Sequence, residues 1–215
     1  MARASRSSDL EVVTVEGPAR VHLSRPASST RGALVLGHGA GAGVETPDLL
    51  AVRDAAVDAG WAVALVVQPW KVSGRKVATA PPRLDAAWRD VVRHLVDGGA
   101  LPAGPLVLGG RSAGARVACR TAGELGAAGV CCLAFPLHPP GRPDRSRADE
   151  LPADLPVLVV QGRRDAFGGP DDVRRAAPSS VQVAAVDGDH GLRRDPAAVA
   201  AVVVAWLAQQ EQVHG

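Results

Sequence analysis

Three residues of this chain have the types, and the order along the sequence, that nucleophilic catalysis requires. Ser112 lies in a Gly-x-Ser-x-Gly pattern, Asp165 follows a later apolar run, and His190 follows the last one. A serine hydroxyl is a poor nucleophile until a base takes its proton, and imidazole can do this near neutral pH. A carboxylate fixes the imidazole tautomer and stabilises the imidazolium as it forms. The sequence therefore predicts a catalytic triad of Ser112, Asp165 and His190 that works through an acyl-enzyme on Ser112.

The residues around Ser112 predict a nucleophile elbow, the sharp turn that holds a serine between a strand and a helix. Apolar Leu106–Leu108 leads into Gly110-Arg-Ser-Ala-Gly114, and a helical segment of small residues follows. The turn strains the serine backbone and leaves no room for a Cβ at neighbouring positions. The pattern is weak by itself, because chance produces it in about 0.1 of chains this rich in glycine. The alternative is an ordinary glycine-rich turn.

The other two triad members follow strands, where functional groups of parallel sheets gather. Asp165 comes just after the apolar strand predicted at 156–161, and His190 comes just after the one at 181–186. The order serine, aspartate, histidine is that of α/β hydrolases. As alternatives, Asp165 could cap a turn and His190 could be a solvated loop residue. Asp187 and Asp189 are competing acids, but they flank the histidine too closely to orient its ring easily.

A second glycine-rich loop, Gly37-His-Gly-Ala-Gly41, follows another apolar strand and is predicted to form the oxyanion hole. The backbone N–H of Ala40, or of its neighbour Gly41, would act with that of Ala113 on the negative charge that develops on the substrate oxygen. His38 would order this loop through hydrogen bonds rather than serve as the general base.

The same loop also fits a relaxed dinucleotide-binding fingerprint, which is the second interpretation of this segment. That fingerprint needs an acidic residue at the end of the following strand, and here the strand ends Val67-Gln68-Pro69. The sequence therefore favours the oxyanion loop, and we expect no bound cofactor.

Composition excludes several other classes of protein. The chain has 215 residues, of which 47% are hydrophobic and 21% charged, as in a globular domain. A net charge of +2 is too small to indicate a nucleic-acid partner. The longest apolar run, Pro196–Ala208, is too short to span a membrane, and no hydrophobic segment follows Met1–Ser8 as a secretory signal requires. We expect no membrane association.

Cysteine usage indicates buried free thiols and no metal site. Cys119, Cys131 and Cys132 do not make a disulfide framework, and the adjacent pair lies in an apolar run where buried free thiols are expected. No His or Cys cluster has the spacing of metal ligands. The predicted location is cytoplasmic.

Continuous apolar strands alternate with amphipathic helices, which predicts the α/β class: a mostly parallel sheet covered by helices on both faces. An antiparallel hairpin is expected at the N-terminal edge, with strands at 10–15 and 21–23. We expect one domain over residues 10–211 after a flexible N-terminus, 1–9. Further strands are predicted at 33–36, 61–67, 106–108, 129–135, 156–161 and 181–186, and helices at 47–60, 81–96, 171–177 and from 196.

These motifs together resemble one branch of the α/β-hydrolase superfamily, the small capless bacterial proteins related to subunit three of the eukaryotic NSL histone-acetyltransferase complex. The resemblance starts near residue 20 and rests on both glycine-rich motifs, on 161–168 and 188–190, and most specifically on Phe135-Pro-Leu-His-Pro-Pro-Gly-Arg142. It implies an α/β-hydrolase fold without a cap domain and the triad given above. Relatives usually carry Met-Gly-Gly after the serine, where this chain has Ala113-Gly-Ala115, so one wall of the pocket is altered.

The segment between Phe135 and Pro156 is too short for a lid domain, so we expect an open cleft. That favours a small or flexible ester, thioester or amide as the acyl substrate. His38, Arg111, His138 and Arg142 are candidates for the substrate pocket, and the cationic ones could pair with a carboxylate or phosphate of the substrate. The favoured alternative is that Arg111 and Arg142 pair with Asp144, Asp149 or other acidic loop residues.

Two functions from different classes remain open at this point. The first is a serine hydrolase of the esterase or thioesterase type. The second is a non-catalytic protein of the same fold that binds a ligand or serves as a complex subunit, since the branch includes complex subunits. A protein partner is compatible with the sequence but not indicated by it.

Overall fold

The apolar runs of the sequence form one eight-stranded sheet. A computed structural model describes the backbone of residues 6–27 and 29–214 and the side chains of 6–27 and 29–210. The strand order is β1-β2-β4-β3-β5-β6-β7-β8; β2 is antiparallel to both β1 and β4, and all other neighbours are parallel. The strands are β1 Arg6–Thr14, β2 Gly17–Arg25, β3 Gly32–Gly37, β4 Trp61–Val67, β5 Leu106–Arg111, β6 Gly129–Leu133, β7 Val157–Gly162 and β8 Val181–Val186.

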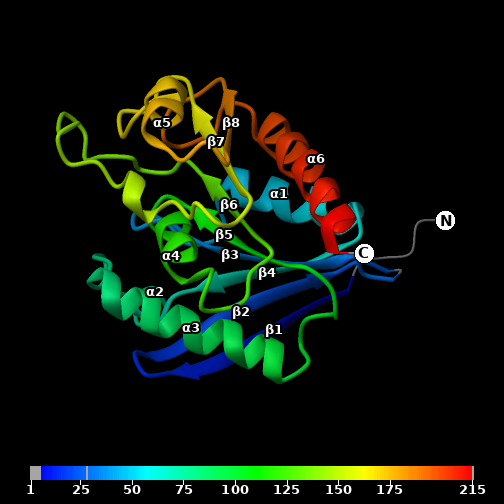
Figure 1. Cartoon of the computed structure of the whole chain (residues 1–215). Helices are drawn as coiled ribbons and strands as arrows, with labels where there is room; N and C mark the ends of the chain where they lie inside the picture. The colour runs from blue at the N-terminus through cyan, green and yellow to red at the C-terminus, as the bar shows by residue number, and fades with distance from the viewer. Residues whose placement is uncertain (1–5, 28, 215) are drawn as a thin grey trace.

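Helices cover both faces of the sheet, as the sequence predicts (Figure 1). On one face α1 and α6 pack side by side, while α3, α4 and α5 cover the other face. This is the α/β-hydrolase architecture with an antiparallel N-terminal edge. The helices are α1 Pro47–Asp58, α2 Pro69–Val72, α3 Pro81–Asp97, α4 Ala113–Thr121, α5 Pro170–Ala176 and α6 Pro196–His214, and a 3-10 turn, η1, lies at Ala148–Glu150.

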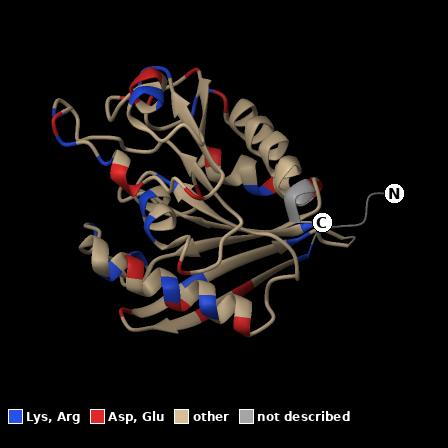
Figure 2. Cartoon of the chain, in the orientation of Figure 1, with Lys and Arg blue, Asp and Glu red and all other residues tan. Residues whose placement is uncertain are grey.

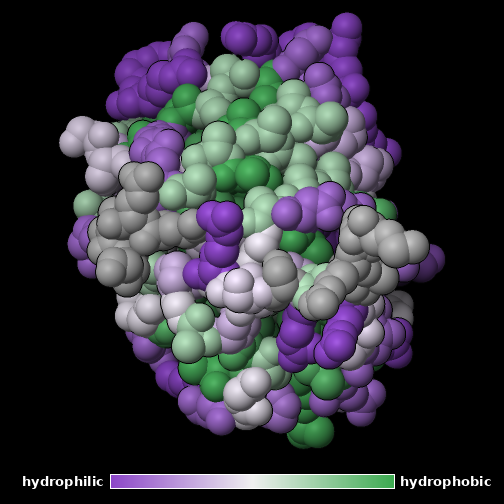
Figure 3. Space-filling view, turned by 90° about the vertical axis from the view of Figure 1, so that its right-hand side faces the viewer, coloured by the Kyte–Doolittle hydropathy of each residue, from purple (hydrophilic) through white to green (hydrophobic). Residues whose placement is uncertain are grey.

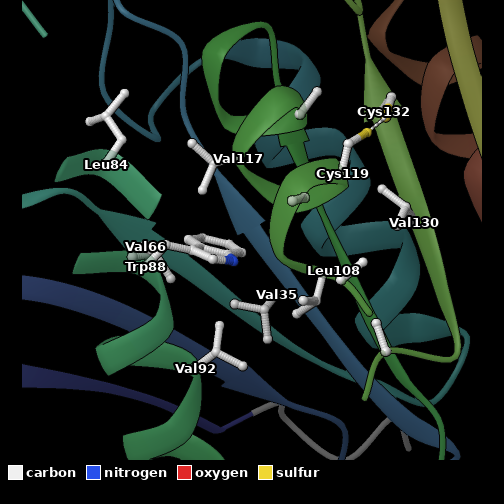
Figure 4. Packing of buried hydrophobic residues seen from close by; sticks show 14 of the residues in the cluster. Val35, Val66, Leu84, Trp88, Val92, Leu108, Val117, Cys119, Val130 and Cys132 are labelled. Carbon is white, nitrogen blue, oxygen red and sulfur yellow. Dashed lines mark hydrogen bonds between the residues drawn. The ribbon is translucent and has the colours of Figure 1, made fainter. Parts of the chain in front are cut away.

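Each face of the sheet has its own hydrophobic core. On the α3 and α4 side the predicted helical stripe, which includes Leu84 and Leu95, is buried, and Trp88 is completely enclosed. Figure 4 shows Trp88 between α3 and the strands, with Val35 and Val117 directed toward it. The helix that carries the predicted nucleophile therefore begins against a tightly packed layer.

Helix α6 is apolar on more than its buried face. Val199, Val203 and Trp206 pack on the sheet, as the predicted stripe requires. No charged residue occurs in its sequence from Pro196 to Gln210, so the helix is tan over most of its length in Figure 2. Figure 3 views the molecule from this side and shows apolar residues over the upper middle of the face. The solvent-facing side of α6 carries small side chains, at Ala201, Ala205 and Ala208.

The structure differs from the predicted element boundaries mainly at the edge hairpin. Strand β1 begins at Arg6 rather than Leu10, and its register pairs Arg6 with Arg25. Its first residues are exposed polar ones joined by backbone hydrogen bonds, which leave no hydrophobic pattern in the sequence. Of the N-terminus predicted to be flexible, residues 6–9 thus belong to β1, and residues 1–5 lie outside the described part of the chain.

Two further boundaries have local causes. Strand β6 ends at Leu133 and not at Phe135, because Ala134 has a φ of 49°, outside the β region. The four-residue helix α2 was not predicted, since one turn leaves no periodic pattern. At the start of α1, Thr46 occupies the expected N-cap position, but its hydroxyl makes no capping hydrogen bond and Pro47 opens the helix.

The segment between β6 and β7 contains no cap domain. Its only regular element is the turn η1, which lies against α4, and part of the remaining loop extends away from the sheet (Figure 1). Among the described residues, no helix has the length and apolar character needed to cross a membrane.

The two neighbouring valines of α6 provide a test of this packing. Val203 is fully buried and Val204 is only partly buried. We expect Val203→Ala to lower the free energy of unfolding by about 2 kcal/mol, because it removes buried methyl groups and leaves a cavity. Val204→Ala makes the same change in helix propensity and should cost less than about 0.5 kcal/mol. Urea denaturation of both variants checks this, and equal losses would contradict the assigned buried face.

Candidate active site

The turn after β5 has the strained geometry expected of a nucleophile elbow. Ser112 has φ of 52° and ψ of −109°, a conformation that side-chain-bearing residues rarely adopt. A Cβ at Gly110 would lie 2.5 Å from the Gly37 carbonyl oxygen, and one at Gly114 would lie 2.5 Å from the Gly37 carbonyl carbon. The start of α4 therefore lies against the end of β3 with no side chain between them.

The structure brings Ser112, His190 and Asp165 into one hydrogen-bonded chain. The Ser112 hydroxyl lies 2.9 Å from His190 Nε2, and His190 Nδ1 lies 2.8 Å from Asp165 Oδ2. With the proton on Nδ1, the imidazole donates to the carboxylate and its Nε2 is free to accept from the serine. This is the arrangement that lets a histidine take a serine proton while a carboxylate fixes its tautomer.

Asp165 is held by partners that the sequence alone did not indicate. Its side chain is fully buried; Gln161 Nε2 donates to Oδ2 at 3.0 Å, and the Phe167 N–H donates to Oδ1 at 2.8 Å. The Phe167 ring also packs against the His190 imidazole, with centroids 4.2 Å apart. The one available signal is a polar glutamine at the end of an otherwise apolar strand, where a buried amide needs partners.

The competing acids lie elsewhere. Asp187 pairs with Arg164 and Arg194, and Asp189 Oδ1 accepts from the backbone N–H of Gly191. Neither bonds the His190 ring, because a residue so close in sequence cannot reach its Nδ1. The acid next to the histidine is Asp165.

The loop after β3 lies beside Ser112, as the predicted oxyanion hole requires. Ala40, Gly41 and Ala113 line the same cleft as Ser112 and His190. Within the described residues, no backbone acceptor is bonded to the N–H of Ala40 or Ala113. Ala113 is the first residue of α4, where backbone N–H groups have no partner in the helix and favour negative charge.

His38 is a structural residue of this loop and does not line the cleft, contrary to its inclusion among the pocket candidates. Its Nδ1–H donates to the Gly39 carbonyl at 2.8 Å, and its Nε2 accepts from the Gln68 N–H at 3.1 Å. The ring is buried, which lowers the pKa of His38; the Gly39 carbonyl opposes this shift and the charge of Lys71 adds to it. A neutral His38 thus ties the end of β3 to the end of β4.

Arg111 is a second cross-link rather than a free cation. Its Nε lies 3.1 Å from Asp48 Oδ2, and its Nη2 donates to the His190 carbonyl at 2.8 Å. The Asp48 side chain is fully buried at the start of α1, and only 11% of the Arg111 side chain is exposed. The partner is an acid of α1 and not one of the loop acids Asp144 and Asp149.

The two other pocket candidates lie away from the cleft. His138 Nδ1 is 3.0 Å from the Pro139 carbonyl, and Arg142 makes an exposed ion pair with Asp144, 3.6 Å apart. Neither lines the space beside Ser112, because the loop after Leu137 turns outward toward solvent. Their side chains are not brought to the site.

The cleft beside Ser112 is open and has a volume of about 470 Å³. Its walls come from the β3 loop, the start of α4 and the loops after β6, β7 and β8. Among the described residues, no cluster of three His, Cys, Asp or Glu side chains is placed to hold a metal ion. The residues that line the cleft are Ala40, Gly41, Ala42, Arg111, Ser112, Ala113, Arg116, Pro136, Arg147, Phe167, His190 and Arg193.

Comparison with known sequences assigns this architecture to a family. The model of the family described as "Alpha/beta hydrolase domain" matches residues 30–201, which include every residue of the Ser112–His190–Asp165 chain. A search among curated proteins found no match.

Solved structures of low sequence identity share the fold. An α/β serine hydrolase homologue from Coxiella burnetii superposes with a TM-score of 0.79 at 17% identity, covering 93% of this chain and 97% of its own. A lidless α/β serine hydrolase from Xanthomonas campestris gives 0.72 at 19% identity, covering 99% and 96%. A dienelactone hydrolase from Anabaena variabilis gives 0.77 at 19% identity, covering 96% and 99%.

Substitution of Gly114 tests the close backbone approach under the elbow. Alanine is the better helix former, so Gly114→Ala would stabilise α4 if space were available. We expect a loss of about 2–3 kcal/mol in the free energy of unfolding instead, because the new Cβ collides with the Gly37 backbone. Gly123→Ala is the control, since a Cβ there meets nothing within 4 Å. Thermal and urea unfolding of both variants give the answer; a Gly114→Ala protein as stable as the control would contradict this geometry.

The buried imidazole of His38 predicts a pH dependence of stability. Because its pKa in the folded protein is lowered from the ordinary 6.5, the unfolded chain takes up the proton first as the pH falls. Stability is therefore full above the ordinary value and is lost as the pH drops below it. The slope from this one proton cannot exceed about 1.4 kcal/mol per pH unit.

His38→Gln is the variant that isolates this contribution, since an amide oxygen can still accept from the Gln68 N–H. We expect it to be less stable than the natural chain at pH 7.5 but to lose less stability on going to pH 5.5. Urea denaturation at several pH values measures both slopes. Parallel slopes would mean that His38 does not titrate differently in the two states.

Proposed function

The chain belongs to the alpha/beta hydrolase domain family, and we propose that it is a serine hydrolase that cleaves esters or thioesters of small or flexible acyl groups. The observation that carries the proposal is the hydrogen-bonded chain from Ser112 through His190 to the buried Asp165. A protein that only binds a ligand has no need for a serine, a histidine and an aspartate joined by hydrogen bonds in this order. The strained backbone of Ser112 supports the same conclusion, since strain persists where the surrounding structure enforces it.

The proposed reaction proceeds through an acyl-enzyme. Ser112 Oγ attacks the carbonyl carbon of the substrate while His190 Nε2 accepts the hydroxyl proton. The N–H groups of Ala113 and of Ala40 or Gly41 bind the oxyanion, and each donor lowers the barrier by about 3 kcal/mol. His190 then returns the proton to the departing alcohol or thiol, leaving the acyl group on Ser112.

Deacylation uses the same groups, with a water molecule as the nucleophile and Ser112 as the leaving group. A water molecule in the open cleft gives a proton to His190 and attacks the acyl carbonyl, and the second oxyanion forms in the same place as the first. Collapse of this intermediate returns the proton to Ser112 Oγ and releases the acid. Asp165 keeps the imidazole oriented in both half-reactions, because its buried oxygens accept hydrogen bonds from Gln161, Phe167 and His190.

The shape of the cleft supports a small or flexible acyl group. The segment between β6 and β7 adds only the turn η1 and no lid, so a long acyl chain would remain in contact with water. The structural neighbours are described as serine hydrolases and a dienelactone hydrolase, which agrees with hydrolysis of a carboxylic ester. The cytoplasmic location and the specific likeness to the NSL-complex subunit stay predictions from the sequence.

Active-site labelling tests the proposal directly. A fluorophosphonate forms a covalent adduct only with an activated serine. Intact-mass spectrometry should find one adduct on the natural chain and none on Ser112→Ala. Ser180→Ala is the matched control and should label like the natural chain, because the exposed Ser180 hydroxyl donates to the Ala153 carbonyl and has no histidine beside it among the described residues.

Turnover of a short aryl ester should fall at least about 10³-fold in Ser112→Ala, leaving only the background from binding and the oxyanion donors. A folded natural chain without an adduct would overturn the proposal. The non-catalytic ligand-binding function would then be the one to pursue.

A further inference from the structure

The wall of the cleft beside Ser112 carries charge of one sign. Among the described residues, its lining includes four arginines, Arg111, Arg116, Arg147 and Arg193, and no aspartate or glutamate. A cleft lined by one sign of charge raises the local concentration of oppositely charged ligands. Whether these arginines are available to a ligand depends on what else each guanidinium contacts.

Two of the four are already neutralised by carboxylates. Arg111 pairs with the buried Asp48. Arg116 donates from Nε to Glu150 Oε2 at 2.7 Å and from Nη2 to Oε1. Burial raises the pKa of Glu150, but Arg116 and Arg120 more than offset this and the net shift is downward, so the carboxylate stays charged. These two pairs shape the cleft without leaving a free positive charge.

Arg147 lines the cleft without a carboxylate of its own. Its Nη1 donates to the Pro136 carbonyl at 2.9 Å, which places the half-buried side chain on the cleft wall. No ion pair joins it to any described residue. Burial lowers the pKa of Arg147, the like charge of Arg116 adds to this, and Glu150 opposes it only in part. This guanidinium is partly desolvated, and no carboxylate among the described residues forms an ion pair with it.

Arg193 reaches the cleft from the other side, three residues after His190. It is exposed and makes no hydrogen bond or ion pair within the described residues. Its neighbour Arg194 differs, because Arg194 Nε pairs with Asp187 at 2.8 Å and does not line the cleft. Adjacent arginines of the same loop are thus divided into one that is paired and one that is free beside the site.

We infer that Arg147 and Arg193 form an anion subsite, and that the substrates are esters or thioesters carrying a second, negatively charged oxyanion group. A carboxylate or a phosphate has the required chemistry, since guanidinium groups bind both through charge-assisted hydrogen bonds. The inference rests on the proposed hydrolase function and adds its substrate class. It replaces the sequence-based candidates Arg111, His138 and Arg142, which are paired or lie outside the cleft.

Two matched ester pairs test the subsite by turnover. In the first, 4-nitrophenyl hydrogen adipate is compared with neutral 4-nitrophenyl hexanoate, so that the charge is on the acyl side. In the second, 4-acetoxybenzoate is compared with its methyl ester, so that the charge is on the leaving group. The natural chain should have the higher kcat/KM for the charged member of at least one pair. Equal or lower kcat/KM for the charged member of both pairs would overturn the inference.

Charge-removing variants assign the preference to these residues. Arg147→Gln should lower the charged-to-neutral ratio of kcat/KM about tenfold, the size of one charge-assisted hydrogen bond in a partly buried site. Arg193→Gln should lower it about threefold, because an exposed charge is screened by solvent. Arg194→Gln removes the same charge one position away and should leave the ratio unchanged. A ratio that falls equally in Arg194→Gln would mean that net charge, and not a subsite, is responsible.

A binding measurement separates failure of the subsite from failure of the hydrolase function. Ser112→Ala protein is titrated by calorimetry with butyrate and with butyl phosphate, and neither titration needs turnover. Binding of either anion that weakens about fivefold or more in the additional Arg147→Gln background supports the subsite, and the tighter of the two identifies the oxyanion. Binding of neither anion overturns it, whatever the labelling of Ser112 shows.

Discussion

The close contact between the end of β3 and the start of α4 is the constraint on which the site depends. Gly37, Gly110 and Gly114 meet there with no Cβ between them, so the Ser112 turn can be sharp and its backbone strained. The same contact sets the β3 loop beside the first N–H of α4, which makes an oxyanion site possible. The strain is sustained by the packed layer around Trp88 on one side and by the parallel strands β3 and β5 on the other.

Buried polar cross-links then fix the loops that a sheet alone cannot position. His38 joins the β3 loop to the end of β4, and Arg111 joins the start of α1 to the His190 loop. Burying Asp48 and Arg111 carries a desolvation cost that pairing only partly repays, so the ion pair is weak evidence for stability. Its geometric effect is clearer: it holds the carbonyl of His190, and through it the loop that carries the imidazole.

Much of this arrangement could be predicted from the sequence, for physical reasons that also explain the gaps. Buried parallel strands are continuous apolar runs, so β3 to β8 were predicted, and Ser112, Asp165 and His190 each follow one of them. The polar start of β1 could not be predicted, because its ladder of backbone hydrogen bonds leaves no side-chain pattern. Nor could the partners of Arg111 or Asp165, since Asp48 and Gln161 meet them only through the fold.

The absence of a lid between β6 and β7 has a consequence for how such a site could select substrates. Burial of apolar surface contributes about 25 cal/mol per Å², so an open cleft gains little from holding an acyl chain that water still contacts. Specificity must then come from a few directed polar contacts. Arg111 and Arg116 are committed to Asp48 and Glu150, and this leaves Arg147 and Arg193 as the charges of the cleft that a substrate can neutralise. In an open cleft of this fold, directed polar contacts of this kind can supply selectivity that enclosure does not.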